Sequence, residues 1–175
     1  MIFLMIRRVM KVWNPDMSGP GWPPGFHCLE CGAKEVARVT GKEVYPGRPD
    51  LHDLPMHLCS CGAYCGCHPG TDVPLGYPSG AETRRARMLL HKHMIEPISL
   101  QAGRKKRNKV RTALYRFLSS AMGLPRELTH TGMFSVEQCR EAWRHLRGVS
   151  ANDLLEGRWN TPSPTAAEAS PNLEI

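Results

Sequence analysis

The feature that most constrains this chain is the crowding of soft metal ligands in HLCSCGAYCGCHPGTDVPLG (residues 57–76), which holds four cysteines and two histidines. An earlier stretch, CLECG, supplies a C-x2-C pair, which places two thiolates on one backbone loop. The later CSCG repeats the Cys-Gly ending after 27 intervening residues. Zinc binds four such ligands in a tetrahedron. The spacing therefore predicts a closed, structural zinc site formed by Cys28, Cys31, Cys59 and Cys61.

The second pair leaves the identity of the fourth ligand open. Its two cysteines are separated by one residue, which is one fewer than in the usual knuckle. Cys65, Cys67 or His68 is therefore an alternative ligand. The simpler interpretation of Cys65 and Cys67 is burial beneath the knuckle, and Cys139 fits the apolar stripe of a later helix.

The remaining composition favours a reducing compartment. The chain has 175 residues and seven cysteines, an odd number, and its opening MIFLMI lacks the flanking pattern of a secretory signal. Paired cysteines then indicate metal rather than disulfides. No stretch approaches the length of a membrane span, so we expect a cytoplasmic protein with no membrane partner.

The order of patterns predicts an α+β fold: a small zinc-ribbon or treble-clef-like β-hairpin module followed by about three α-helices. The hairpin is expected in VARVT-GK-EVY, with a tight turn at Gly41-Lys42. The helices are expected from Ser79 to about Glu96, where Pro97 follows; from RKKRNK to Gly123; and from the capping box Ser135-x-x-Gln138. Four segments result: a Pro/Gly-rich lead-in (1–25), a zinc module (26–78), a helical region packed on it (79–157) and a disordered tail (158–175).

Positive charge gathers in the first two predicted helices. Eleven Lys or Arg stand between Arg84 and Arg116 against one acid, Glu96, in a chain of net charge +7. Such a segment is typical of a protein that binds phosphate backbones, although a solvated helix face gives the same pattern. The predicted contacts are Arg84, Arg85, Arg87, Lys105, Lys106, Arg107, Lys109 and Arg111.

Two histidines allow a different hypothesis. His68 follows the second knuckle, and His91 falls on the arginine face of the next helix. A histidine beside a zinc knuckle and another on a following helix is reminiscent of metal-dependent HNH-like nucleases, in which one activates water. His93 falls on the leucine face and is expected in the core or beside the zinc.

The motifs C-x2-C, C-x-CGAYxGCHPGTDxPLG, RRARxxLH and THTGMFSVEQCR together resemble a family of small phage and prophage proteins that contain a zinc finger. The resemblance covers residues 26–147. It implies an N-terminal zinc finger at the four cysteines, a mobile-element origin in a bacterial host, and no particular activity. The short Cys59–Cys61 spacing and the extra Cys65 depart from the family pattern.

These observations favour a zinc-stabilised protein that binds nucleic acid through a basic helical face and is not an enzyme. A modulator of a host nucleic-acid or defence complex would use the same face against an acidic partner. Nuclease action by His68 and His91 is the third hypothesis.

Overall fold

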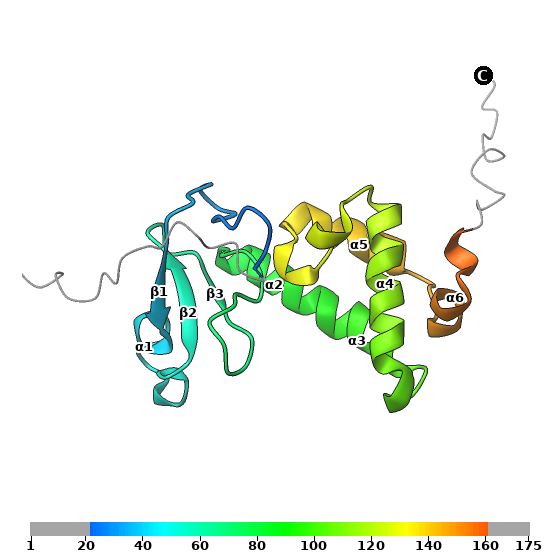
Figure 1. Ribbon diagram of the computed structural model, residues 1–175, viewed down its shortest axis with the longest axis horizontal. Coiled ribbons are helices and arrows are strands. Elements are labelled where there is room, and N and C mark those ends of the chain that lie inside the picture. Colours follow the sequence, from blue (N-terminus) through cyan, green and yellow to red (C-terminus); the bar gives the residue numbers. More distant parts are fainter. Residues whose placement is uncertain (1–21, 161–175) are drawn as a thin grey trace, which may run out of the picture.

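The computed structural model describes residues 22–160 and places a small sheet at one end and helices at the other (Figure 1). The sheet contains β1 (Val36–Thr40), β2 (Pro55–Cys59) and β3 (Tyr64–Gly66). The helices from α2 onward lead away from it, with α6 (Ala151–Glu156) farthest from the sheet. The predicted α+β class, a zinc module followed by helices, is confirmed. The domain boundaries stay a prediction, and most of the lead-in and tail lies outside the described residues.

The sheet is antiparallel, in the order β1-β2-β3, and its register brings the two cysteine motifs together. β1 begins just after the first motif, and β2 ends at the second. Val36 pairs with Cys59, and Leu58 pairs with Tyr64, so both motifs meet at the same end of the sheet. Because antiparallel register is fixed along the whole ladder, this pairing sets the positions of all four cysteines.

The predicted hairpin is wrong in its second strand. The residues after β1 form α1 (Gly41–Val44), and the partner of β1 comes from residues 55–59 instead. Thr40 and Glu43 form a capping box, in which the Thr40 N–H donates to Glu43 Oε2 at 3.0 Å. Gly41 fits because a Cβ there would lie 1.8 Å from the Leu51 carbonyl oxygen. The T-x-x-E pattern of Thr40 and Glu43 therefore marks the start of a helix. Gly41 is needed because the backbone of Leu51 passes close to it, and not because of a tight turn.

The first long helix is capped by Gly80 instead of Ser79, and it continues through Pro97. α2 (Ala81–Leu90) is followed by a π-helical turn (His91–Ile95) and by α3 (Glu96–Leu100), which together form one continuous rod (Figure 1). Pro97 lies in the first turn of α3. Since a proline lacks the N–H and crowds the preceding turn, we attribute the passage to the wider π-helical turn, in which the Glu96 N–H reaches the His91 carbonyl. The predicted end at Glu96 is therefore wrong.

The predicted Ser79–Glu82 capping box does not form. The N-cap of α2 is Gly80, whose N–H donates to Glu30 Oε1 at 2.6 Å, and Thr83 Oγ1 donates to the same oxygen at 3.1 Å. Glu30 lies inside the first cysteine motif. A carboxylate from the zinc module therefore caps the helix that begins the helical region.

The later helices follow the sequence closely. α4 (Arg107–Ala121) buries Val110, Leu114 and Leu118, and it ends before Gly123, which has a φ of 61°. α5 (Val136–Leu146) has the expected Ser135–Gln138 capping box and buries Cys139, Ala142 and Leu146. The short α6 was not predicted. No helix among residues 22–160 is long and apolar enough to cross a membrane.

The two largest hydrophobic cores lie one at each end of the molecule, and a small cluster of Cys28, Cys59 and Ala63 surrounds the metal centre. Residues of the rod, α4, α5 and α6 form the larger core, around Leu90, Leu114 and Phe134. The smaller core contains Phe26, Val36, Cys65 and Tyr77.

Arg87 joins the two ends of the molecule. It lies on α2 and is buried, with 9% of its surface exposed. Its guanidinium donates to the carbonyl oxygens of Phe134 (2.8 Å) and Tyr77 (3.0 Å) and to Ser79 Oγ (3.1 Å). Burial lowers the pKa of Arg87 to about 10, which still leaves it charged at neutral pH. The side chain thereby ties α2 to the loop after β3 and to the approach of α5.

We expect Arg87→Met to lower the free energy of unfolding by about 2–4 kcal/mol, because it removes charge-assisted hydrogen bonds from buried carbonyls. The exposed Arg85→Met, two residues away on the same helix, is the matched control and should change it by no more than about 0.5 kcal/mol. Urea unfolding of the zinc-loaded proteins measures both values. Equal effects of the two substitutions would contradict the structural role of Arg87.

Candidate metal centre

The first cysteine motif forms a compact knuckle. The Cys28 N–H donates to the Ala33 carbonyl (2.8 Å), and the Gly32 N–H donates to the Cys28 carbonyl (2.9 Å). Gly32 has a φ of 74°, a conformation that glycine adopts without strain. The backbone N–H groups of Glu30 and Cys31 are thereby turned toward the Cys28 sulfur. The loop presents two sulfurs and supplies donors that stabilise their anionic form.

The second motif repeats these bonds in a loop that is one residue shorter. The Cys59 N–H donates to the Ala63 carbonyl (2.8 Å), and the Gly62 N–H donates to the Cys59 carbonyl (2.9 Å). Gly62 also has a positive φ, 88°. Both motifs thus close on the sequence Cys-Gly-Ala, and the shorter spacing gives a tighter turn with the same outcome. This resolves the doubt about the fourth ligand in favour of Cys61.

The four sulfurs fit a zinc ion. All four Sγ atoms of Cys28, Cys31, Cys59 and Cys61 lie within 4.8 Å of one another. The Cys28–Cys61 and Cys31–Cys59 Sγ distances are both 3.5 Å. A tetrahedron with zinc–sulfur bonds of about 2.3 Å has edges of about 3.8 Å, close to these separations. Four thiolates complete the coordination of the ion, so the predicted zinc site is a structural one.

Protonation of these thiols competes with the metal. Burial raises the pKa of Cys28 to about 12. At Cys59 burial also raises the pKa, but the Cys61 N–H and the neighbouring thiols outweigh it and bring the value to about 7. Since zinc binds thiolates, it must displace the protons of the cluster, and its affinity falls as the pH falls.

The alternative ligands lie elsewhere. Cys65 is in the smaller core, where burial raises the pKa of its thiol to about 12, and Cys67 is half-buried with a pKa raised by burial to about 11. Neither sulfur belongs to the group formed by Cys28, Cys31, Cys59 and Cys61. His68 is exposed on the loop after β3. Within residues 22–160, the four cysteines are the only group of three or more His, Cys, Asp or Glu side chains placed to share an ion.

That result bears on the nuclease hypothesis. In the described part of the chain, His68 and His91 belong to no group of three or more side chains placed to share an ion, so a second, catalytic metal gains no support. The prediction for His93 is wrong. It is exposed, and its ring lies 6.2 Å from that of Trp143, because the π-helical turn shifts the phase of the helix.

The predicted phosphate contacts divide into two groups. Arg87 is buried and bonded within the protein, so it is not available, and Arg107 is paired with Glu96. Arg84 lies 3.7 Å from the centre of the Tyr64 ring and donates to the Ser79 carbonyl. The other five are exposed or half-buried and form no ion pair with described residues: Arg85, Lys105, Lys106, Lys109 and Arg111.

His130, which precedes a short 3-10 helix (Thr131–Met133), was not predicted as a site residue. Its ring packs 5.2 Å from the Tyr115 ring, in a pocket that also includes His68. The only signal was its place in the quoted THTGMF stretch.

We expect purified protein to hold one zinc per chain and Cys61→Ser to weaken zinc binding strongly, since a hydroxyl is a poor replacement for a thiolate. Cys67→Ser is the matched control, because Cys67 lies directly after β3 and outside the group of four cysteines, and it should keep the full stoichiometry. Elemental analysis and competition with a chromophoric chelator measure both. Normal zinc affinity in Cys61→Ser would exclude this ligand set.

The comparisons agree with the geometry. A family model described as a zinc-finger-containing domain matches residues 25–149, which include both knuckles and the helices through α5. No curated protein matches the chain. No solved structure matches it either. Because the match covers most of the chain, the protein belongs to the family defined by this zinc-finger-containing domain.

Proposed function

We propose that the protein binds nucleic acid, with the zinc module fixing the position of a basic helical surface. The observation that carries the proposal is the cluster of exposed cations at the start of α4. Arg104, Lys105, Lys106 and Lys109 are all exposed and form no ion pair with described residues. We call these four residues the α4 cation cluster.

Folding alone does not favour this placement. Arg104–Lys106 form a 3-10 turn directly before α4, and the N-cap, Lys106, makes no side-chain cap. Positive charge at a helix N-terminus opposes the macrodipole and costs about 0.3–1 kcal/mol per exposed charge. A polyanion bound there would offset that cost and release counterions from its backbone.

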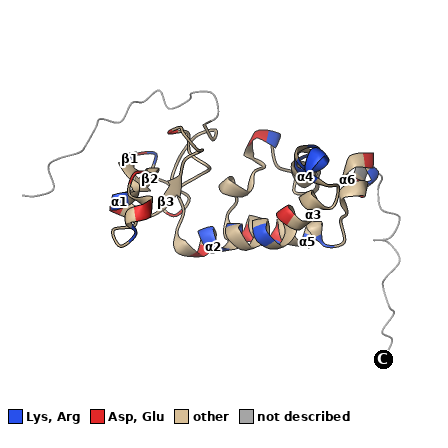
Figure 2. Cartoon of the chain, turned by 90° about the horizontal axis from the view of Figure 1, so that it is seen from below, with Lys and Arg blue, Asp and Glu red and all other residues tan. Residues whose placement is uncertain are grey.

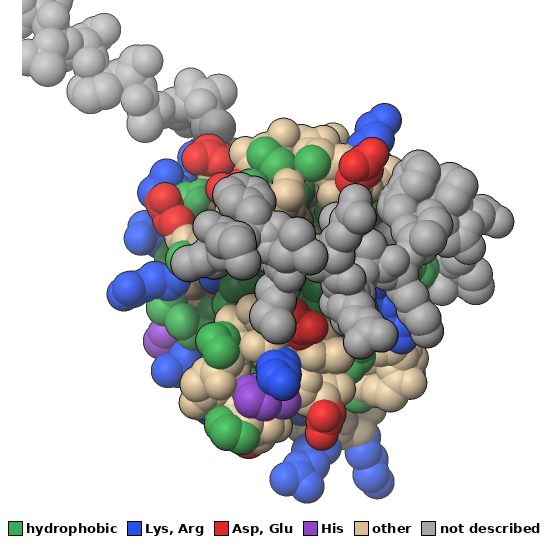
Figure 3. Space-filling view, turned by 90° about the vertical axis from the view of Figure 1, so that its left-hand side faces the viewer, with side chains coloured by type: hydrophobic (Ala, Val, Ile, Leu, Met, Phe, Trp, Pro, Cys, Tyr) green, Lys and Arg blue, Asp and Glu red, His purple; other side chains and the backbone are tan. Residues whose placement is uncertain are grey.

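The charge pattern differs between the two ends of the molecule. Lys and Arg are interspersed with Asp and Glu on the sheet end (Figure 3), whereas the ribbon at α4 carries a run of Lys and Arg (Figure 2). Arg85 on α2 and Arg111 on α4 add to the exposed positive charge. Base specificity is not part of the proposal, because phosphate contacts carry no sequence information. We further propose that the protein acts in the cytoplasm and originates from a mobile element.

We expect the affinity for duplex DNA to fall with salt at a log–log slope of about −4.5 to −5.5, which corresponds to five or six phosphate contacts. The triple variant Lys105→Ala/Lys106→Ala/Lys109→Ala should reduce that slope by about 2–3. Fluorescence anisotropy across a salt series measures both slopes.

The matched control is Lys34→Ala/Lys42→Ala/Arg48→Ala, which removes three exposed cations from the zinc module. It should leave the slope nearly unchanged. If both triple variants lower the slope equally, only net charge matters and the proposed surface is wrong. If the unmodified protein shows no salt-dependent binding to DNA or RNA, the function itself is wrong.

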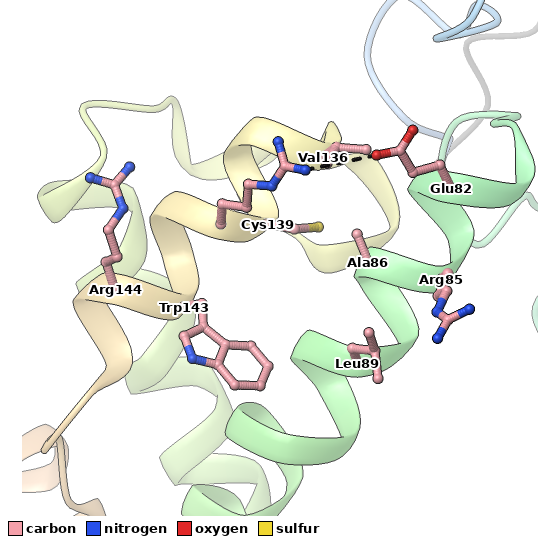
Figure 4. A pocket seen from close by; sticks show the side chains of 9 residues that line it. Glu82, Arg85, Ala86, Leu89, Val136, Cys139, Trp143 and Arg144 are labelled. Atoms are coloured by element: carbon pink, nitrogen blue, oxygen red, sulfur yellow. Dashed lines mark ion pairs between the residues drawn. The ribbon is translucent and has the colours of Figure 1, made fainter.

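A groove between α2 and α5 favours a second candidate, the binding of a protein partner. It has a volume of about 560 Å³. Val136, Cys139 and Trp143 of α5 face Ala86 and Leu89 of α2 (Figure 4).

Charges line the rim of this apolar groove. Arg85, Arg140 and Arg144 stand against one acid, Glu82, which lies 3.8 Å from Arg140. An apolar floor with a basic rim suits an amphipathic helix that carries acidic residues beside its apolar face.

We expect a labelled model helix of Leu and Glu to bind this groove about tenfold more tightly than a Leu and Lys helix of the same pattern. Arg140→Glu/Arg144→Glu should remove the preference, while Arg116→Glu/Arg126→Glu, away from the groove, should retain it. Fluorescence anisotropy measures the affinities. Equal binding of the two helices by the unmodified protein would exclude the groove as an acidic-helix site.

A further inference from the structure

Three histidines from distant parts of the sequence lie near one another, and two of them line one pocket. His68 lies on the loop after β3, His91 begins the π-helical turn, and His130 precedes the 3-10 helix Thr131–Met133. His68 and His130 both line a pocket of about 320 Å³, and His91 is near enough for its charge to act on His130. Each lies in a different one of the stretches GCHPGTD, RRARxxLH and THTGMF. π-helical turns are frequent at functional sites.

His130 is held in one orientation. Its Nδ1 accepts a hydrogen bond from the Gly132 N–H at 3.2 Å, and its ring packs against Tyr115. Burial is the main cause that lowers the pKa of His130 to about 4, and nearby Arg111, His68, His91 and Arg126 contribute to the same shift. The ring is therefore neutral at pH 7. Because Nδ1 is the acceptor, the proton is assigned to Nε2, which makes that atom a hydrogen-bond donor.

Two arginines and one acid stand around His130. Arg126 lines the pocket, and Arg111 of α4 is near enough to contribute to the lowered pKa of His130. The acid on the pocket wall is Glu127, which is exposed. Neither arginine forms an ion pair with a described residue; Arg126 makes a long hydrogen bond to the Thr129 carbonyl, at 3.5 Å. Such a cleft, with a strongly perturbed titratable group, is typical of a binding site.

The ligand chemistry follows from the donors. The three histidines do not form a group whose ring nitrogens could share a metal ion, as far as residues 22–160 are concerned. Imidazole N–H and guanidinium groups instead suit an oxyanion, and arginine suits phosphate in particular. Pro74, Leu75 and Met133 give the pocket an apolar wall that fits the sugar or base beside a phosphate.

We propose that the pocket between the loop after β3 and the Arg126–Met133 segment is a phosphate-ester site, in which Arg126, His68 and His130 bind the phosphate of a nucleotide. The phosphate belongs either to a free nucleotide or to the end of a nucleic-acid strand. The site uses none of the residues of the α4 cation cluster, so it does not rest on the proposed function.

The test uses the full-length, zinc-loaded protein with ¹⁵N-labelled histidine and follows the ring resonances by NMR. The probes are inorganic phosphate, a nucleoside 5′-monophosphate and a short single strand with a 5′-phosphate, each to about 20 mM, which detects affinities in the millimolar range. We expect saturable shifts of His68 and His130, with no shift of His52 in the zinc module. Arg126→Gln should weaken binding about tenfold. Arg116→Gln, an exposed arginine on α4, should bind normally.

Tighter binding of the strand than of the mononucleotide identifies a strand end as the ligand, and the reverse identifies a free nucleotide. The absence of saturable His130 shifts with all three probes, or unchanged binding by a folded Arg126→Gln protein, would overturn the site. The Lys105→Ala/Lys106→Ala/Lys109→Ala variant separates the two proposals. It should keep the phosphate-induced shifts even where its salt-dependent binding is lost.

Discussion

The antiparallel pairing of β1 with β2 is the constraint on which the zinc centre depends. Each cysteine motif sits at a strand end, and the register that pairs Val36 with Cys59 brings those ends together. The ladder alone does not stabilise such a small sheet, because three short strands bury little apolar surface. The ion adds the missing stabilisation by joining the two knuckles, and the strands in turn hold the four sulfurs at separations that suit zinc.

Hydrogen bonds connect the zinc module to the helices. Glu30, between Cys28 and Cys31, caps α2, and Arg87 on the same helix bonds carbonyls on both sides of the junction. The pocket around His130 lies at this junction, next to the point where the Tyr77 N–H bonds the Gly132 carbonyl. Backbone there approaches too closely for any side chain on Gly76, since a Cβ would lie 1.9 Å from that carbonyl oxygen. The proposed phosphate site therefore forms only when both parts of the molecule are folded together.

The features that were predicted correctly depend on residues that are close together in the sequence. The knuckles, the Ser135 capping box and the apolar stripe of α4 each follow from residues within a few positions of one another. Two of the predictions that failed depended on contacts beyond the neighbouring residues, and a third depended on an irregular turn of the helix itself. Ser79 accepts from Arg87 rather than capping α2, the strand opposite β1 comes from residues 55–59, and Pro97 is tolerated because of a π-helical turn. From its charge alone, Arg87 was predicted to lie on the surface. It is buried because three acceptors outside its own helix bond its guanidinium.

Because Glu30 caps α2 from within the first knuckle, the stability of this helix depends on the metal. A cell short of zinc would leave the knuckle that positions this carboxylate without its anchor, and the first turn of α2 would then fray. Unwinding there would reach Arg87, four residues beyond Thr83, and open the junction between the two cores to proteolysis.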